Sequence, residues 1–317
     1  MKIMLTGAAG FIGFHLSKSL LDDGYEVFGI DNFNNYYDNR IKYDRAKILK
    51  SYTNFSISQI DINDKKMLSN AFKLFNPQKV VNLAAQPGVR GCQFSSQEYI
   101  NSNMFGFLNI IELSRLFEVD GFFYASSSSV YSANNKVPSS ESDNIKMPVN
   151  LYAATKRSNE LIAHSYSYLY ELNTTGLRYF TVYGSWYRPD MAIFIFIDKI
   201  ISGEAIPVHN YGKMKRDFTF IDDIVNGTRS AIDSNYKCEI FNLGNNKSIE
   251  LMSLISIIEE NLGRNIIIDY KPMQFGEVYE TCADISHSKE KIGYEPQTTI
   301  KIGLPKLIKW YKEYYNV

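Results

Sequence analysis

The stretch Lys2-Ile3-Met4-Leu5-Thr6-Gly7-Ala8-Ala9-Gly10-Phe11-Ile12-Gly13 decides the fold. Its apolar start predicts a strand, and the segment after the glycines predicts a helix. Gly7 permits a tight turn, Gly10 lets the backbone approach a pyrophosphate, and Gly13 lets the helix pack closely against the strand. Free N–H groups and the helix dipole favour an anion at this helix start. The stretch therefore predicts a dinucleotide site, in which Phe11 and Ile12 also contact the cofactor.

Asp31 ends the second predicted strand, 18 residues after Gly13. A carboxylate at this position can accept hydrogen bonds from ribose hydroxyls and repel a 2′-phosphate. No arginine follows immediately, because the next residues are Asn32-Phe33-Asn34-Asn35. The pattern favours NAD over NADP. The alternative is an aspartate that only caps a turn at the strand end.

Strand-like and helix-like segments alternate through the first two-thirds of the chain. This alternation predicts right-handed crossovers and an α/β fold with a doubly wound parallel (Rossmann) sheet. The predicted strands are Lys2–Thr6, Tyr25–Ile30, Phe55–Ile60, Lys79–Leu83, Gly121–Ala125 and Thr174–Tyr179, and the predicted helices are 11–23, 64–75, 97–118 and 151–171.

The regular alternation of strand-like and helix-like segments changes after about residue 184. Residues 1–184 are predicted to form the NAD-binding domain with the catalytic residues. Residues 185–317 are predicted to form mainly a smaller C-terminal α/β domain for the substrate, with a soft boundary across which segments can interleave. In this part we expect helices at 191–202, 221–234, 250–261 and 300–316, and strands near 206–208, 239–242 and 266–269.

Composition excludes several classes of partner. Lys plus Arg and Asp plus Glu both number 34, so no net field attracts nucleic acid or an anionic membrane. No apolar stretch approaches the length of a transmembrane helix. Three scattered cysteines suit reduced thiols in the cytoplasm better than disulfides. Four histidines show no metal-ligand spacing, so we expect no metal.

Tyr152 and Lys156 lie four residues apart at the start of a predicted helix, which places phenol and ammonium on one face. A phenol needs about 3 units of pKa depression to act as a base near neutrality, and a nearby ammonium and a cationic nicotinamide can contribute. Residues 126–129 are four serines at the end of the fifth predicted strand. Ser127 or Ser128 can therefore hydrogen-bond the reacting hydroxyl. The alternatives are a surface helix pair and a polar loop.

In this order, the glycine motif, the serine segment and the Tyr-x-x-x-Lys pair resemble the extended short-chain dehydrogenase/reductase superfamily, which includes the NAD-dependent epimerases and dehydratases. The resemblance implies that further residues contact the cofactor. These are Asn32, Asp61, Ile62, Leu83, Ala84, Ala85, Asn103, Ser126 and Tyr179, together with Tyr152 and Lys156.

The resemblance is closer to the UDP-glucuronate 4-epimerases and covers nearly the whole chain. It rests on residues 83–90, 125–131, 151–156, 188–192 and 210–223. It implies reversible oxidation at C4 of a UDP-sugar by resident NAD. Related dehydratases and decarboxylases carry acids in the serine segment, where this chain has Ser128 and Ser129. No acid there is available for chemistry at C5 or C6.

Thr181 and Arg188 are the candidates for holding a uronate carboxylate, which arginine can bind bidentately. A surface salt bridge is the alternative for Arg188. Arg216 is the candidate for the nucleotide diphosphate, and Arg90 could face phosphate, sugar or a partner subunit. The other expected substrate contacts are Gln86, Ser127, Ser128, Ser129, Phe194, Val208, Tyr211, Gln274 and Glu277.

Two other functions stay open. A UDP-hexose 4-epimerase or a UDP-glucuronate decarboxylase would share this fold. A dinucleotide-sensing regulator without turnover is the more distant alternative, although such regulators tend to lose the Tyr-x-x-x-Lys pair. Family members dimerise through the helices corresponding to 97–118 and 151–171. We therefore expect a homodimer, with intramolecular packing of Phe105, Phe107, Leu108, Ile162 and Tyr166 as the alternative.

Overall fold

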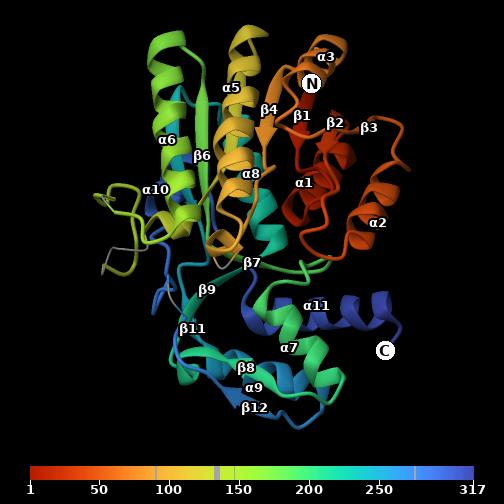
Figure 1. Cartoon of the computed structure of the whole chain (residues 1–317), viewed down its shortest axis with the longest axis vertical. Coiled ribbons are helices and arrows are strands. Elements are labelled where there is room, and N and C mark those ends of the chain that lie inside the picture. Colours follow the sequence, from red (N-terminus) through yellow and green to blue (C-terminus); the bar gives the residue numbers. More distant parts are fainter. Residues whose placement is uncertain (90, 132–135, 146, 275) are drawn as a thin grey trace.

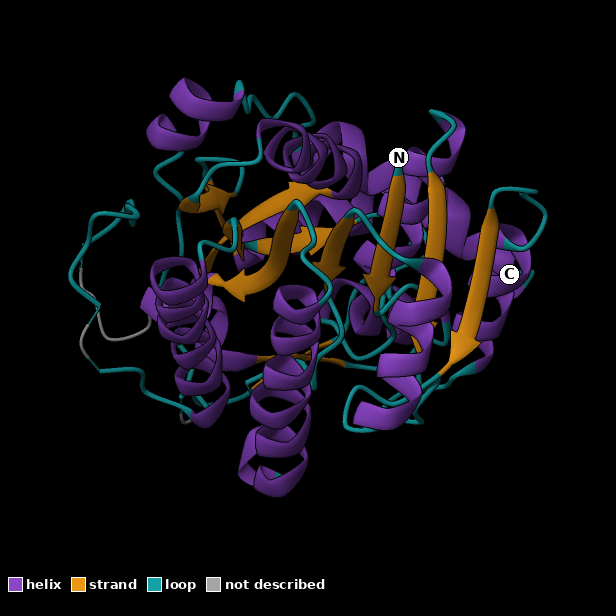
Figure 2. Ribbon diagram, turned by 90° about the horizontal axis from the view of Figure 1, so that it is seen from above, coloured by secondary structure: helices purple, strands orange, loops and turns teal. Residues whose placement is uncertain are grey.

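The computed structural model describes residues 1–89, 91–131, 136–145, 147–274 and 276–317. Its centre is a parallel sheet of seven strands in the order β10-β6-β5-β4-β1-β2-β3 (Figures 1 and 2). This confirms the predicted doubly wound fold. The strands are β1 (Lys2–Thr6), β2 (Glu26–Asp31), β3 (Phe55–Gln59), β4 (Lys79–Asn82), β5 (Gly121–Ser127), β6 (Thr174–Tyr179) and β10 (Cys238–Leu243).

Helices cover both faces of this sheet (Figure 2). The α3, α5 and α6 helices pack on one face, and α1 and α8 pack on the other, with α2 beside α1. Their bounds are α1 (Phe11–Asp22), α2 (Arg40–Leu49), α3 (Lys65–Phe75), α4 (Ser96–Ile100), α5 (Phe107–Leu116), α6 (Leu151–Tyr170) and α8 (Ile221–Ser234).

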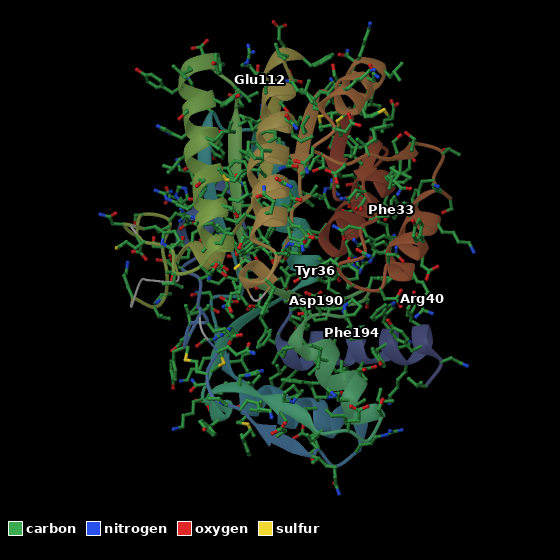
Figure 3. The ribbon with its side chains drawn as sticks, in the orientation of Figure 1. Phe33, Tyr36, Arg40, Glu112, Asp190 and Phe194 are labelled. Atoms are coloured by element: carbon green, nitrogen blue, oxygen red, sulfur yellow. The ribbon has the colours of Figure 1, made fainter. Side chains whose placement is uncertain are left out.

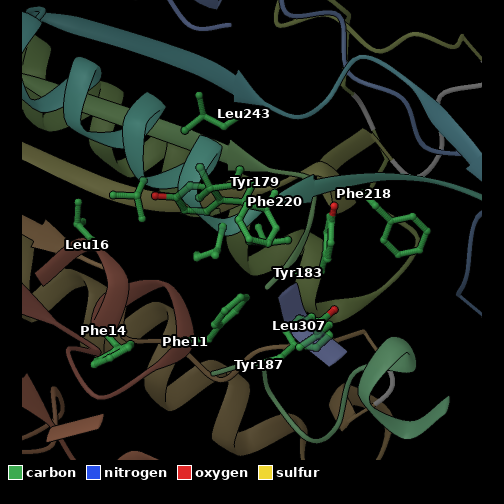
Figure 4. Packing of buried hydrophobic residues seen from close by; sticks show 14 of the residues in the cluster. Phe11, Phe14, Leu16, Tyr179, Tyr183, Tyr187, Phe218, Phe220, Leu243 and Leu307 are labelled. Atoms are coloured by element: carbon green, nitrogen blue, oxygen red, sulfur yellow. The ribbon is translucent and has the colours of Figure 1, made fainter. Parts of the chain in front are cut away.

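Alternation along β1 divides the core between these faces. Ile3 and Leu5 join the cluster around α1, whereas Met4 joins the cluster around α3 and α5. Successive side chains of a strand point to opposite faces, so a central strand that is apolar throughout is buried on both sides. The α1-side cluster continues through Tyr179 and Phe218 into the second part of the molecule (Figure 4). The two parts therefore share one core.

The second part lies beyond the carboxyl ends of the central strands (Figure 1). It contains a three-stranded sheet in the order β11-β9-β7 and a parallel pair, β12 and β8. These strands are β7 (Thr181–Tyr183), β8 (Ile206–Val208), β9 (Lys215–Phe220), β11 (Ser248–Glu250) and β12 (Ile268–Tyr270), and the helices are α7 (Ala192–Ile201), α9 (Leu251–Leu262), α10 (Ser286–Ile292) and α11 (Ile300–Tyr315).

Several elements differ from the sequence predictions. No prediction covered α2, β7, β9, β11 or α10. The predicted helix 97–118 consists of α4, a π-helical segment (Asn101–Gly106) and α5. The β10 strand follows residue 184, yet it pairs with β6 in the central sheet. The chain thus returns to the first part after it has begun the second.

Candidate active site

A cavity of about 730 Å³ lies between the two parts of the molecule. Its walls include the glycine turn, the ends of β2, β4, β5 and β6, the start of α6, and segments from β7 to residue 281. Ligands of open α/β sheets bind at the carboxyl ends of the strands. The fold therefore brings the predicted cofactor, catalytic and substrate segments to one site.

The glycine turn has the backbone geometry that an anion site needs. Gly7 has a φ of +72°, a left-handed conformation that glycine adopts without strain. The Gly10 N–H donates to Gly7 O at 2.9 Å. A Cβ on Gly13 would lie 2.0 Å from Gly7 O, so only glycine fits where α1 crosses the turn. No side chain caps α1 at Gly10, which leaves its first N–H groups available for a pyrophosphate.

Asp31 is buried at the end of β2 and borders the cavity. Its Oδ2 accepts a hydrogen bond from the Ala9 N–H at 3.0 Å, and its Oδ1 accepts one from the Phe33 N–H at 2.9 Å. Burial raises the pKa of this carboxyl above its usual value. The carboxylate is thus fixed beside the glycine turn, where the ribose of an NAD adenosine is expected.

Lys42 of α2 also borders the cavity near Asp31, and the sequence analysis missed it. Its Nζ donates to the backbone O of Asn34 at 2.8 Å and to Asn34 Oδ1 at 2.6 Å. Burial lowers the pKa of this lysine to about 8. No motif marked Lys42, because only the packing of α2 brings it to the cofactor side.

The predicted catalytic pair, Tyr152 and Lys156, lies at the start of α6. Asn150 caps this helix by accepting the Ala153 N–H at 2.8 Å, which sets the first turn that carries Tyr152. Lys156 Nζ donates to Ala125 O at 2.8 Å and is 5.9 Å from the centre of the Tyr152 ring. The helix thus holds its phenol and ammonium against the end of β5.

Burial acts against the ionised forms of both catalytic side chains. It raises the pKa of Tyr152, while a hydrogen bond with Ser127 and the charge of Arg188 act in the opposite direction. Burial also lowers the pKa of Lys156 to about 8. A cationic nicotinamide beside the phenol would favour the phenolate further. The site therefore fits a cofactor that brings a positive charge.

The hydroxyl groups of the serine segment bond to neighbouring side chains and also border the cavity. Ser126 Oγ donates to Glu160 Oε1 at 2.6 Å, and Glu160 forms a buried ion pair with Arg178 at 2.8 Å. Ser127 Oγ donates to Ser129 Oγ at 3.1 Å and accepts the Ser129 N–H at 3.2 Å. All four serines of residues 126–129 border the cavity. The segment thus offers hydroxyl groups next to Tyr152, with no carboxyl group among them.

The predicted carboxylate-binding residues also reach the cavity. Thr181 and Arg188 line it. Arg188 donates from Nε to Asp190 Oδ1 at 3.0 Å and from Nη2 to Asp190 Oδ2 at 2.5 Å. Figure 3 shows Asp190 near Tyr36, which also lines the cavity and which no sequence motif indicated. This end of the site offers a cation close to the catalytic phenol.

Arg216 on β9 also lines the cavity. Its Nη2 lies 3.8 Å from Glu277 Oε2, and its Nη1 donates to Tyr279 O at 3.1 Å. Glu277 lines the cavity too. The two residues, 61 positions apart in the chain, meet at the cavity wall.

Most of the predicted cofactor residues line the cavity, whereas Asp61 and Asn103 do not. Asp61 accepts a hydrogen bond from Asn32 Nδ2 at 2.8 Å, which orients a residue that does line it. Asn103 Nδ2 donates to Gln86 O at 3.1 Å, and its Oδ1 accepts the Gln86 N–H at 2.8 Å. Asn103 thus holds the loop after β4 in place without lining the cavity itself.

Several predicted substrate residues are not among the cavity-lining residues. Val208 is fully buried, because alternate residues of β8 point into the core, and its neighbours Pro207 and His209 line the cavity instead. Phe194 packs on Tyr311, with ring centres 5.1 Å apart. Tyr211 is 59% exposed. The structure also places Gln86 and Gln274 away from the lining, and Arg90 lies outside the described residues.

Two further properties concern the described residues only. None of their helices combines the length and apolar character needed to cross a membrane. Their histidine, cysteine and carboxylate side chains form no group that could hold a metal ion.

Comparisons with known proteins show which family and which solved structures the chain resembles. Residues 3–244 match the model of the NAD dependent epimerase/dehydratase family. UDP-glucuronate 4-epimerase 4 of Arabidopsis thaliana is 42% identical over 337 residues, which cover all of this chain and 76% of that protein. The structure of UDP-glucuronic acid 4-epimerase from Bacillus cereus, in complex with UDP-glucuronic acid and NAD, is similar with a TM-score of 0.94. It is 32% identical, and the match covers 99% of this chain and 100% of that one. The UDP-glucose 4-epimerase from Thermotoga maritima is 28% identical with a TM-score of 0.90, over 99% and 100% of the two chains.

Proposed function

Because the chain belongs to the NAD dependent epimerase/dehydratase family, we propose that it interconverts UDP-glucuronate and UDP-galacturonate by epimerisation at C4. One observation carries this proposal. Tyr152 and the serine segment share a cavity with Thr181 and Arg188, which suit a carboxylate, and residues 126–129 contain no acid. The site can therefore bind a uronate and remove the proton of its 4-hydroxyl, whereas the serine segment offers no general acid for chemistry at C5 or C6.

Each of the cavity residues has a separate role in the proposed reaction. Tyr152 takes the proton of the 4-hydroxyl and later returns it, and Ser127 hydrogen-bonds that hydroxyl and the phenol. Lys156 supplies a positive charge behind the phenol, and its bond to Ala125 O fixes its position. Gly10 and Asp31 would hold the pyrophosphate and ribose of NAD, which would supply reversible hydride transfer at C4.

A uronate requires a particular restraint at C5. Its 4-keto form is a β-keto acid, which loses CO2 when the carboxylate can rotate into the cleavage geometry. Thr181 and Arg188 restrain this rotation by hydrogen bonds to the carboxylate, and Asp190 fixes the guanidinium that makes one of them. A site that grips the carboxylate favours epimerisation over decarboxylation.

Incubation of the purified protein with UDP-glucuronate, without added NAD, tests this function. We expect UDP-galacturonate as the product, no CO2, and NAD that copurifies with the chain. UDP-pentose as the main product would mean a decarboxylase, and turnover of UDP-glucose alone would mean a hexose epimerase. The Tyr152→Phe variant should keep its NAD and lose most activity, by a factor of about 10²–10⁴. No reaction with any nucleotide sugar would leave the non-catalytic alternative.

We also propose that the protein is a homodimer that pairs through the π-helical segment Asn101–Gly106, α5 and α6. Phe105, Leu108 and Leu161 are 56%, 41% and 54% exposed, whereas Phe107 is buried within the chain and Ile162 and Tyr166 pack against its core. Exposed apolar side chains on neighbouring helices are typical of an interface. Light scattering should find a dimer that Leu161→Glu dissociates, while Leu74→Glu, on the exposed surface of α3, leaves it intact. A wild-type monomer would contradict the proposal.

We place the enzyme in the cytoplasm. The support is that Cys92, Cys238 and Cys282 are all free thiols, as is usual in a reducing compartment.

A further inference from the structure

Three consecutive backbone carbonyls, those of residues 185–187, receive hydrogen bonds from the cofactor-binding half of the molecule. His15 Nε2 on α1 lies 2.8 Å from Ser185 O. Arg45 Nη2 on α2 donates to Trp186 O at 2.5 Å and to Tyr187 O at 3.5 Å. We call His15 and Arg45 the carbonyl brace. The segment they hold leads directly into Arg188, the proposed ligand of the substrate carboxylate.

Arg45 is a fully buried guanidinium with 0% exposure. Within the described residues, no carboxylate forms a salt bridge with it, and its Nε has no hydrogen-bond partner. The charge of Arg45 acts on the Asp31 carboxyl without a direct contact, and an apolar side chain of similar volume would avoid the cost of burying the guanidinium. Packing alone therefore does not account for arginine here, and its acceptors indicate what it does.

The other end of the brace is the glycine turn. Arg45 Nη1 donates to Ala9 O at 2.9 Å and to Tyr37 Oη at 3.2 Å. The Ala9 N–H in turn donates to Asp31. One guanidinium thus joins the backbone of the proposed pyrophosphate site to the backbone in front of Arg188. The fork geometry of arginine allows this, because its two Nη atoms point to different acceptors.

The segment that the brace holds has an uncommon backbone conformation. Trp186 has a φ of +59°, in the left-handed region that residues other than glycine seldom adopt. Such a conformation persists where surrounding contacts determine it. Hydrogen bonds to the carbonyls on both sides of this residue supply those contacts, so they also set the direction in which the chain reaches Arg188.

We propose that Arg45, assisted by His15, is a positioning residue that aims the Arg188 guanidinium at the C5 carboxylate of the substrate. This inference rests on the proposed function, since it concerns selectivity for a uronate over a neutral sugar. The carbonyl brace acts through the backbone of residues 185–187. Because Arg45 also bonds Ala9 O, the position of this backbone depends on the folded glycine turn. Arg45 itself touches no substrate, because it is not among the residues that line the cavity.

Calorimetric binding to the NAD-loaded protein tests the proposal. All proteins carry Tyr152→Phe, so that ligands bind without turnover, and the ligands are UDP-glucuronate, UDP-glucose and UDP. Arg45→Lys keeps the charge and loses the fork. We expect it to raise the Kd of UDP-glucuronate about tenfold, the equivalent of one charge-assisted hydrogen bond, and to change the other two Kd values less than about twofold.

Arg229→Lys is the matched control. Arg229 also links two elements, because its Nη1 on α8 donates to Ser19 Oγ on α1 at 3.1 Å, but it lies away from the cavity. Its substitution should leave all three Kd values unchanged. A structural role of Arg45 would lower the melting temperature and weaken the three ligands alike. Either that result or an unchanged Kd for UDP-glucuronate would overturn the proposal.

Two further variants separate this inference from the proposed function. Arg188→Lys should abolish the preference for UDP-glucuronate. If it does not, the proposed carboxylate grip is wrong, whatever Arg45 does. His15→Leu removes the donor to Ser185 O, and we expect a smaller selective loss, about threefold. If Arg45→Lys fails to fold, this variant decides, and an unchanged preference for the uronate would refute the brace.

Discussion

Tyr152 lies in a buried position that raises the pKa of its phenol. A general base works best when its pKa is near the operating pH, so the site must favour the phenolate by other means. The structure provides a hydrogen bond with Ser127 and the positive charge of Arg188. The nicotinamide cation adds to these when NAD is bound. At the scale of single residues, then, the role proposed for Tyr152 depends on groups that offset the desolvation of its hydroxyl.

Ser127→Ala should shift the pH dependence of the reaction. Loss of a hydrogen bond that stabilises the phenolate raises the pKa of Tyr152, so the acid limb of the kcat/KM profile moves to higher pH. At pH 7 we expect a loss of about tenfold or more, which diminishes as the pH rises. Ser165→Ala is the control, because that serine lies on the exposed face of α6 and bonds Leu161 O. A uniform loss at every pH would contradict this role for Ser127.

His15 should make the folded chain sensitive to acid. Burial lowers its pKa from 6.5 to about 4. Between these values the unfolded chain binds a proton that the folded chain does not, so stability falls as the pH drops below 6.5 and is unaffected above it. Urea unfolding at pH 7 and pH 5 should show that His15→Gln removes about 1–2 kcal/mol of the wild-type loss. An equal loss in both proteins would show that His15 does not titrate in this way.

At the scale of elements, the turn between β1 and α1 was predictable because its requirements are local. A strand, three glycines and a helix follow one another within twelve residues. By contrast, α2 was missed, since its buried residues include Lys42 and Arg45 and therefore form no apolar stripe. The β9 strand was missed for a similar reason, because it begins Lys-Arg-Asp, and Asp217 is buried by long-range contacts.

Gly13→Ala should disrupt the packing of α1 on the glycine turn. The added Cβ would meet the backbone oxygen of Gly7 at 2.0 Å, and no side-chain movement can relieve that contact. We expect the free energy of unfolding to fall by about 1–3 kcal/mol or more and copurified NAD to be lost. Denaturant unfolding and absorbance of the released nucleotide measure these effects. Gly24→Asn is the control, because asparagine tolerates its φ of +79° and nothing lies within 4 Å. A variant with normal NAD content would contradict the assigned role of Gly13.

At the scale of the whole molecule, the two parts are interleaved rather than joined end to end. The β10 strand pairs with β6 along six residues, and α8 packs against α1. Lys79 on β4 donates to Ile232 O on α8 at 2.6 Å. The active-site cavity draws its walls from both parts. Cofactor binding and substrate binding therefore depend on one continuous structure.

A fragment of residues 1–184 should fail to fold as an independent NAD-binding domain. It would lack β10 and leave the edge of β6 unpaired, although every residue of β6 is buried in the whole chain. It would also expose the face of α1 that α8 covers. Circular dichroism and nucleotide content should show an aggregated or unfolded fragment without NAD. A cooperative, NAD-loaded fragment would instead support a domain boundary at residue 184.

The sequence by itself determined the parts that depend on neighbouring residues. Periodicity and glycine chemistry predicted β1, α1 and the NAD site, and Tyr152 and Lys156 were predicted as a pair because a helix brings residues four apart together. Family resemblance extended this to Thr181 and Arg188. Only the tertiary structure placed Lys42 and Tyr36 in the cavity and Val208 outside it.

The tertiary structure alone also decided the contacts between distant residues. His15 meets Ser185 across 170 positions, and Arg45 meets Trp186 across 141. No local pattern can encode such a pair, because the folded chain brings together a side chain and an acceptor that lie far apart in the sequence. The sequence thus determined which chemistry the chain carries. The packing of its two interleaved parts decided where Arg188, the proposed ligand of the substrate carboxylate, lies in the cavity.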